Sequence, residues 1–253
     1  MKNDGKDGTI RIGTWNTCWR VPNGNIGKII QGALARECCD VLCVTEGFEG
    51  ILPNGGHVID AGADWGCPIK KGRRKVLLWS KRPWTPHTHA LGLEEFHKGR
   101  FVAGTTDTAS GACLTVIGVC IPWKLSHVTF CKKDLQPWED HKRWLAGFQM
   151  LRSRFPKSRT VVLGDFNQRM PNENEEGKFV PTKIHNALLL AFDGLKFATN
   201  EELPDGLRAI DHIVHTPDLT LTPSGIKVWP KYSNGLKPKL SDHFGVWGDF
   251  GFS

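Results

Sequence analysis

The sequence contains no run of about 18 apolar residues, the length that a membrane-spanning helix requires. It has no low-complexity segment and no internal linker. Residues 1–8 lack the apolar core of a secretory signal, and we expect them to form a disordered lead-in. These absences exclude a membrane span and predict a single domain over residues 9–253, which is long enough to enclose a sizeable hydrophobic core.

Eight cysteines are present, but no two of them form a Cys-x-x-Cys pair. The missing pair argues against a zinc ribbon. Several cysteines lie inside apolar runs, which favours reduced core thiols and a cytoplasmic location. Disulfide bonds in a secreted protein are the alternative.

Positive charge is in excess, because 33 lysines and arginines face 26 aspartates and glutamates, for a formal net charge of +7. A basic protein favours an anionic partner, here nucleic acid or another polyphosphate. The densest basic cluster consists of Lys70, Lys71, Arg73, Arg74 and Lys75, and its first four members are candidate substrate contacts. The plainer interpretation of this cluster is a solvated loop.

Short apolar runs alternate with segments of helical periodicity. The runs predict strands over residues 9–16, 41–44, 74–79, 101–106, 113–121, 161–163, 209–215 and 245–250. Helical spacing of apolar residues predicts helices over residues 25–38, 137–155 and 184–192. This alternation indicates an α/β fold.

Polar side chains stand at the ends of several predicted strands. The apolar run 161–163 leads through a glycine to Asp165 and Asn167. An acidic group at the end of a buried strand is costly unless it is paired, hydrated or bound to a metal ion. Further polar groups flank other strands, at Asn16, Glu46, Asp211, Asp242 and His243. Each is a weak signal alone, but their recurrence predicts an active site whose floor carries Asp165 and Asn167.

Together these segments resemble the endonuclease/exonuclease/phosphatase superfamily, the DNase I-like proteins. The resemblance rests on Trp15-Asn16, Thr45-Glu46, Gly164-Asp165-Phe166-Asn167, Ile210-Asp211-His212 and Ser241-Asp242-His243. It implies a four-layer α/β sandwich in which two packed mixed β-sheets are flanked by helices. It also implies hydrolysis of a phosphate ester with one or two Mg²⁺ or Mn²⁺ ions.

The resemblance assigns the metal environment to three residues. Glu46 would be the principal ligand, since a carboxylate oxygen suits Mg²⁺. By similarity, Asn16 and Asp242 would complete the metal site.

The resemblance also assigns catalytic roles. Asp165 would orient or deprotonate the attacking water, and Asn167 would fix its geometry. His243, held and charged by Asp211, would contact the scissile phosphate and stabilise the charge that develops there.

The sequence departs from the family pattern at two places that bear on the substrate. Many members carry a second catalytic His or Tyr on the strand that here contains residues 119–123. Neither residue type occurs at these positions in this sequence. His127 and His141 are the candidates to replace the missing residue, and Trp123 is a candidate substrate contact. The alternative for His141, which shares a helix face with Leu145 and Phe148, is a packing role. Residues 207–210 lack the aromatic wall of abasic-site enzymes, so the resemblance does not imply an abasic pocket.

From the sequence we predict a divalent-metal-dependent phosphodiester hydrolase, a nuclease acting on DNA or RNA as a monomer. The alternative enzyme is a phosphatase or phosphodiesterase for a small-molecule or lipid phosphate ester. A catalytically degenerate polyanion-binding protein is the alternative without catalysis, and the presence of every motif residue argues against it. The sequence leaves open the identity of the substrate and the choice between endo- and exonucleolytic cleavage.

Overall fold

The computed structural model describes residues 8–87, 99–170, 180–200, 203–233 and 237–253. The predicted disordered lead-in over residues 1–8 lies, apart from Gly8, outside the described residues. The elements in chain order are β1 (Thr9–Asn16), α1 (Asn25–Arg36), β2 (Val41–Phe48), β3 (His57–Asp60), β4 (Arg73–Ser80), β5 (Trp84–Pro86), β6 (Phe101–Asp107), β7 (Cys113–Cys120), α2 (Glu139–Arg152), β8 (Thr160–Asp165), α3 (Thr182–Ala191), β9 (Lys196–Phe197), a 3₁₀ turn (Pro204–Gly206), β10 (Asp211–His215), β11 (Leu219–Leu221), β12 (Lys227–Trp229) and β13 (Gly245–Phe252).

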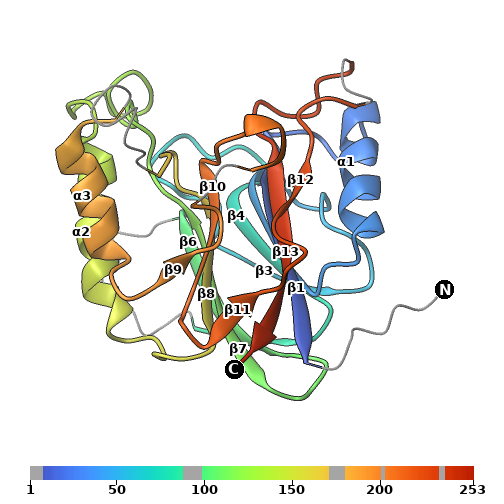
Figure 1. Ribbon diagram of the computed structural model, residues 1–253. Helices are drawn as coiled ribbons and strands as arrows, with labels where there is room; N and C mark the ends of the chain where they lie inside the picture. The colour runs from blue at the N-terminus through green and yellow to red at the C-terminus, as the bar shows by residue number, and fades with distance from the viewer. Residues whose placement is uncertain (1–7, 88–98, 171–179, 201–202, 234–236) are drawn as a thin grey trace.

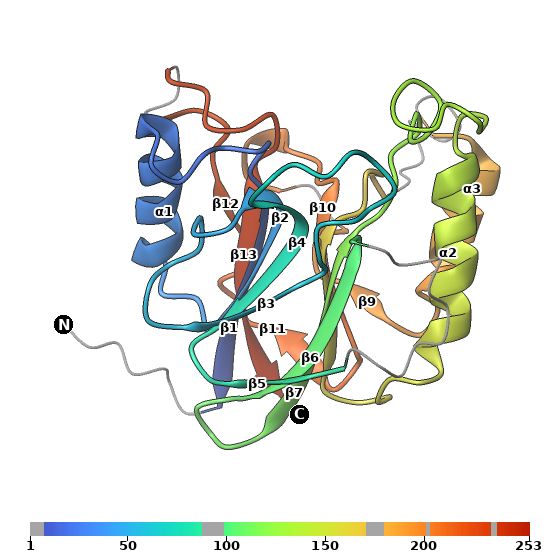
Figure 2. The same ribbon diagram turned by 180° about the vertical axis from the view of Figure 1, so that it is seen from behind.

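The described strands form two mixed sheets. The first has the order β11-β13-β1-β2-β4-β3 with β12 also paired to β13, and the second has the order β5-β6-β7-β8-β10-β9. Only β1 with β2 and β7 with β8 pair in parallel within these described sheets. Figures 1 and 2 show the sheets facing each other, with α1 outside the first sheet and α2 and α3 outside the second. The predicted four-layer α/β sandwich is therefore confirmed.

Three apolar layers hold the sandwich together. Residues such as Ile12, Val116 and Leu163 fill the space between the two sheets. Trp15 belongs to the layer between the first sheet and α1, and Phe148 to the layer between the second sheet and α2 and α3. Removing this much apolar surface from water is the main stabilising contribution to a fold of this kind.

The sequence prediction misplaces several element boundaries. Gly24 rather than Asn25 is the N-cap of α1. Helix α2 ends at Arg152, so Phe155 packs against Phe101 from beyond the helix. The strands that the sequence did not predict are β3, β5, β9, β11 and β12, each two to four residues long and too short for a periodic signal. Among the described helices, none combines the length and apolar character needed to cross a membrane.

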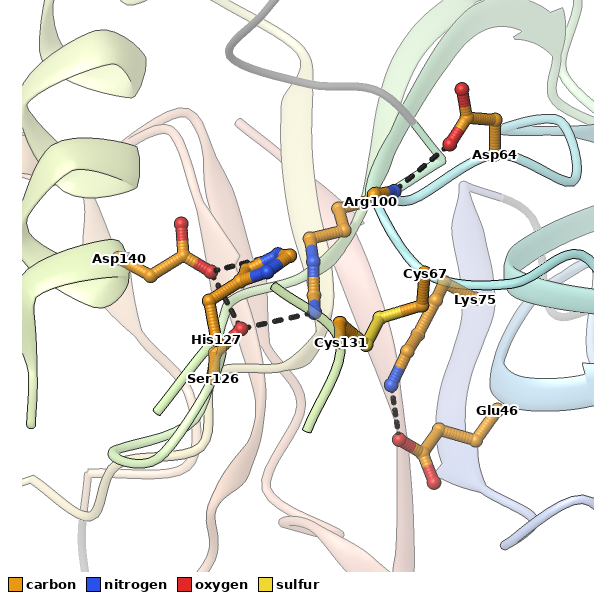
Figure 3. The surroundings of a disulfide bond; sticks show 10 residues. Glu46, Asp64, Cys67, Lys75, Arg100, Ser126, His127, Cys131 and Asp140 are labelled. Carbon is orange, nitrogen blue, oxygen red and sulfur yellow. Dashed lines mark hydrogen bonds and ion pairs between the residues drawn. A yellow bond between two sulfur atoms is a disulfide. The ribbon is translucent and has the colours of Figure 1, made fainter. Parts of the chain in front are cut away.

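A disulfide bond joins Cys67 to Cys131, with Cα atoms 5.0 Å apart, so the expectation of reduced thiols is wrong for this pair. Cys67 lies in the loop between β3 and β4, and Cys131 in the loop between β7 and α2 (Figure 3). The bond thus ties a loop of the first sheet to a loop that follows a strand of the second. The pair is 64 residues apart in sequence, and only the packing of the two sheets brings it together. The buried cysteines that remain free thiols, as expected for core residues, are Cys39, Cys43 and Cys120.

Strand β8 requires a glycine at position 164, directly before Asp165. Its φ is +141°, a conformation that residues with a side chain rarely adopt. A Cβ atom here would lie 1.9 Å from the carbonyl oxygen of Val119 on the neighbouring strand β7. The neighbour is backbone within a paired strand and cannot move aside, so glycine is required to keep β8 paired and Asp165 in place.

We therefore expect Gly164→Ala to lower the free energy of unfolding by about 3 kcal/mol or more, through backbone strain and overlap with β7. Urea denaturation measures this change. The control is Gly32→Ala in α1, where a Cβ atom meets nothing within 4 Å. That change should stabilise the protein by about 0.5–1 kcal/mol, because alanine is the better helix former. Equal stability of Gly164→Ala and the wild type would contradict this account of β8.

Candidate active site

The predicted polar residues meet at one edge of the two packed sheets. Asn16 ends β1 and Glu46 lies near the end of the parallel neighbour β2. Asp165 ends β8, and Asp211 begins the antiparallel strand β10 directly opposite it. His243 reaches the same place from the loop before β13, with its ring 2.6 Å from Asp211. The structure thus brings together side chains from both sheets.

Asp165 is buried, and three hydrogen bonds fix its carboxylate. Its Oδ2 accepts hydrogen bonds from the side-chain amides of Asn16 at 2.9 Å and Asn167 at 3.0 Å. Its Oδ1 accepts one from the backbone N–H of Asn167 at 2.8 Å. Burial raises the pKa of Asp165 to about 7; the charge of His243 opposes this rise, while those of Asp211 and Glu46 add to it. The three hydrogen bonds therefore hold a rigid carboxylate, and burial raises its pKa above the ordinary value.

His243 and Asp211 form a buried ion pair. The imidazole Nδ1 donates to Asp211 Oδ2 at 2.6 Å. Burial of the ring opposes its protonation, but the charges of Asp211 and Asp165 outweigh burial and raise the pKa of His243 to about 10. At neutral pH the ring is an imidazolium with a fixed orientation, which suits contact with an anion.

The hydroxyl of Ser241 holds the Ser-Asp-His segment, residues 241–243, in place. Its hydroxyl donates to the backbone carbonyl of Asn16 at 2.6 Å and accepts the backbone N–H of His243 at 3.2 Å. These bonds fasten the loop before β13 to the end of β1. The charge of His243 overcomes the effect of burial and lowers the pKa of Asp242, so this carboxylate is ionised.

Backbone strain accumulates beside the acidic cluster. The φ angles are positive at Cys18 (49°), Trp19 (58°), Glu46 (47°) and Asn167 (52°), although none of them is glycine. Residues held in such a conformation cost about 1–3 kcal/mol each and persist only where surrounding contacts enforce them. Here the N–H of Trp19 donates to the carbonyl of Glu46 at 2.6 Å. Concentrated strain of this kind is typical of functional sites.

Lys75 belongs to the basic cluster, but the sequence analysis did not predict that it pairs with Glu46. Its ammonium on β4 lies 2.5 Å from Glu46 Oε1 and 5.2 Å from the centre of the Trp19 ring. Figure 3 includes the Glu46–Lys75 ion pair. The antiparallel pairing of β2 with β4 places Lys75 opposite Glu46. Finding it from the sequence would have required the strand register, which no local pattern provides.

The residues at this edge fit a divalent cation. Carboxylate oxygens of Asp165 and Asp211 lie within 4.8 Å of each other. The Oδ1 atom of Asp211 is buried and has no hydrogen-bond partner among the described residues. Carboxylate and amide oxygens are the ligands that Mg²⁺ and Mn²⁺ prefer. A cation bound by Glu46 would compete with Lys75 for the same carboxylate.

The structure does not bring His141 to the site, which corrects its proposed role as a substrate contact. Its side chain is fully buried, and Nδ1 donates to the carbonyl of Pro122 at 2.6 Å. The amide of Gln168 lies 2.9 Å from Nε2, so both ring nitrogens are engaged within the core. His127, the other candidate, lies in the loop that carries Cys131 of the disulfide. Its Nε2 is 4.0 Å from Oδ2 of Asp140 in α2.

The remaining predicted substrate contacts differ in their exposure and in their partners. Lys70 and Lys71 are exposed in the loop between β3 and β4. The Arg73 guanidinium lies 4.8 Å from the centre of the Trp19 ring, while Arg74 forms ion pairs with acidic neighbours. Trp123 is 39% exposed, so its ring is accessible to a ligand.

Two cavities differ in their chemistry. The smaller, of about 290 Å³, is lined by Asp211, Asp242 and His243. The larger, of about 700 Å³, is lined by residues such as Trp65 and His127, and none of the predicted catalytic or metal-binding residues lines it. The smaller cavity is therefore the one that belongs to the candidate active site.

Comparison with known proteins agrees with this arrangement. The model of the Endonuclease/Exonuclease/phosphatase family matches residues 13–243, which confirms the resemblance seen in the sequence. A search of curated proteins finds no match.

Solved structures of similar fold include a phosphatase, an endonuclease and a third protein that is bound to DNA. The 3′ phosphatase NExo from Neisseria, bound to a product DNA hairpin, has a TM-score of 0.64 and 20% identity over 96% of this chain and 99% of its own. An AP endonuclease from Archaeoglobus fulgidus has a TM-score of 0.66 and 19% identity over 94% of this chain and 98% of its own. D. rerio TDP2 with a single-strand DNA product has a TM-score of 0.63 and 14% identity over 97% of this chain and all of its own (100%). Identities this low show a common fold.

The pairing of His243 with Asp211 predicts the pKa of the His243 imidazole. In the metal-free protein we expect the His243 imidazole to titrate at a pKa of about 10, measured by NMR of the ring signals. Asp211→Asn removes the paired charge, so the pKa of His243 should fall towards the ordinary value of about 6.5. His212 on the same strand is the control, because burial lowers its pKa to about 4 and it pairs with Thr199 instead. A pKa of His243 that stays the same in Asp211→Asn would contradict the pairing.

Proposed function

The chain belongs to the Endonuclease/Exonuclease/phosphatase family, and from this premise we propose that it is a divalent-metal-dependent phosphodiester hydrolase that cuts DNA or RNA. The observation that carries the proposal is the juxtaposition of the His243 imidazolium with the buried Asp165 carboxylate in one acidic cluster. Phosphodiester hydrolysis needs both a cationic contact for the phosphate and a group that orients or deprotonates water.

Glu46, Asn16 and Asp242 would hold the metal ion, together with the unpartnered oxygen of Asp211. The ion would be Mg²⁺ or Mn²⁺, and when bound it would neutralise charge on the phosphoryl oxygens as a Lewis acid. This donor set supports the proposal because all four side chains offer oxygen atoms.

The protein's own residues would perform the remaining steps. Asp165, fixed by Asn16 and Asn167, would orient the attacking water and accept its proton. His243 would hold the scissile phosphate through the ring nitrogen that does not face Asp211. Asp211 would keep that ring protonated and correctly turned as charge develops on the phosphate.

Nucleic acid is the substrate class that the charge supports best. The protein carries a formal net charge of +7, and Lys70 and Lys71 are exposed in one loop. Trp123 offers an accessible ring on which a base could stack.

The protein would act as a monomer. For its location, the Cys67–Cys131 disulfide favours an oxidising compartment over the cytoplasm that the sequence predicts.

The test of the proposal is an assay of the purified protein with single- and double-stranded DNA, RNA and a generic phosphodiester, with Mg²⁺ and with chelator. We expect cleavage of at least one polynucleotide that requires the metal ion. Activity on a small or lipid phosphate ester alone would replace the nuclease with a phosphatase. Binding of polynucleotide without any cleavage would indicate a polyanion-binding protein.

Glu46→Gln tests the metal site within the same assay. The neutral amide is a weaker metal ligand, so turnover should fall by about 10²-fold or more while the thermal unfolding midpoint changes little. Calorimetry should show weaker Mg²⁺ binding. The control is Glu139→Gln at the start of α2, whose carboxylate pairs with Arg143 on the same helix. Near-normal activity of Glu46→Gln in Mg²⁺ would remove Glu46 from the site.

A further inference from the structure

Two loops that belong to different sheets are joined beside the candidate active site. The β3–β4 loop, residues 61–72, connects strands of the first sheet, and the β7–α2 loop, residues 121–138, leaves the second sheet. The disulfide between Cys67 and Cys131 links them (Figure 3). The two loops therefore present one continuous surface.

Both loops are attached to residues of the candidate active site. The β7–α2 loop begins with Ile121, whose N–H donates to the carbonyl of Asp165 at 2.8 Å. The carbonyl of Ile121 accepts a hydrogen bond from the side-chain amide of Asn167 at 2.9 Å. In the β3–β4 loop, the ring of Trp65 stacks on that of Trp19, with ring centres 5.4 Å apart. A ligand that lies along these loops would thus reach the acidic cluster.

The β7–α2 loop exposes two neighbouring aromatic side chains. Trp123 is 39% exposed and Phe130 is 64% exposed, with ring centres 6.5 Å apart. Single exposed apolar side chains are common on protein surfaces, whereas adjoining ones indicate a binding surface. Aromatic rings of this kind offer faces on which unpaired bases stack.

The same two loops carry an excess of positive charge. Their lysines are Lys70, Lys71, Lys124, Lys132 and Lys133, and their acidic residues are Asp64 and Asp134. All five lysines are exposed, and none of them pairs with an acidic side chain of the described residues. These ammonium groups can therefore contact phosphates without giving up a protein partner. Positive charge combined with aromatic rings is typical of surfaces that bind single-stranded nucleic acid.

Hydrogen bonds restrain the β7–α2 loop in addition to the disulfide. The hydroxyl of Ser126 donates to Oδ2 of Asp140 at 2.5 Å, and the N–H of Trp138 donates to the carbonyl of Lys124 at 2.8 Å. A surface that is fixed before its ligand arrives loses less conformational entropy on binding.

We propose that the two disulfide-linked loops form one surface that binds single-stranded DNA or RNA and leads the strand to the acidic cluster. Unpaired bases stack on Trp123 and Phe130, and phosphates lie near the lysines of both loops. A duplex fits this surface less well, because its bases stack on one another and do not reach the rings. The inference rests on the proposed nuclease activity and names single strands as the preferred substrate.

The first experiment measures binding of a labelled oligonucleotide, as a single strand and annealed to its complement, with chelator present. We expect the Kd of the single strand to be lower by about tenfold or more, because only unpaired bases can stack on the rings. Equal affinities, or tighter binding of the duplex, would overturn the proposal. Since chelator prevents metal-dependent turnover, single-strand preference without any cleavage in Mg²⁺ would support the surface and reject only the proposed hydrolysis.

Alanine variants test the aromatic rings. Trp123→Ala and Phe130→Ala should each weaken single-strand binding by about fivefold or more and change duplex binding little. Both side chains are exposed, so the thermal unfolding midpoint should stay close to that of the wild type. The control is Leu190→Ala, whose side chain is 58% exposed on α3. Unchanged single-strand affinity in both aromatic variants would overturn the stacking surface.

Lys70→Gln and Lys132→Gln test whether both loops contact the strand. Each should reduce the slope of log Kd against log salt concentration by about 0.7, the value for one phosphate contact of a single strand. The control is Lys157→Gln, an exposed cation just before β8, at the opposite end of that strand from Asp165. A slope that changes in neither loop variant, or in only one of them, would overturn the shared surface.

Discussion

Burial of the facing carboxylates Asp165 and Asp211 is the constraint on which the arrangement of the site depends. The two residues pair across β8 and β10, where neither carboxylate has free access to water. Two buried negative charges are costly unless cations and hydrogen-bond donors surround them. The imidazolium of His243 and the amides of Asn16 and Asn167 supply part of that compensation. A divalent cation would supply the rest.

Both sheets contribute residues that surround the buried carboxylates. Asn16 and Glu46 come from the parallel strands β1 and β2 of the first sheet, and Asp165 and Asp211 come from the second. Gly164 permits the close approach of β7 and β8 that places Asp165 at the edge. The Cys67–Cys131 disulfide links loops that belong to the two sheets. The site therefore exists only when the sandwich is assembled, because its residues come from strands and loops of both sheets.

The sequence was sufficient for the parts of this arrangement that local patterns encode. Buried strands such as β8 and the polar groups at their ends are visible as apolar runs followed by Asp165 or Glu46. Contacts that depend on register or on sheet packing were not visible. Lys75 meets Glu46 through the pairing of β2 with β4, and Cys67 meets Cys131 through the packing of distant loops. For His141 the structure shows the packing alternative, because α2 directs its ring into the core, where Gln168 lies 2.9 Å from Nε2.

We propose that the acidic edge is a divalent-metal centre that supports phosphoryl chemistry. Anomalous diffraction from crystals soaked in Mn²⁺ tests this most directly, because it locates the ion without reference to any substrate. We expect a peak within coordination distance of a Glu46 carboxylate oxygen, about 2.0–2.6 Å, with the Lys75 ammonium moved away from that oxygen. The absence of a peak among Glu46, Asp165, Asp211 and Asp242 at saturating Mn²⁺ would contradict the account.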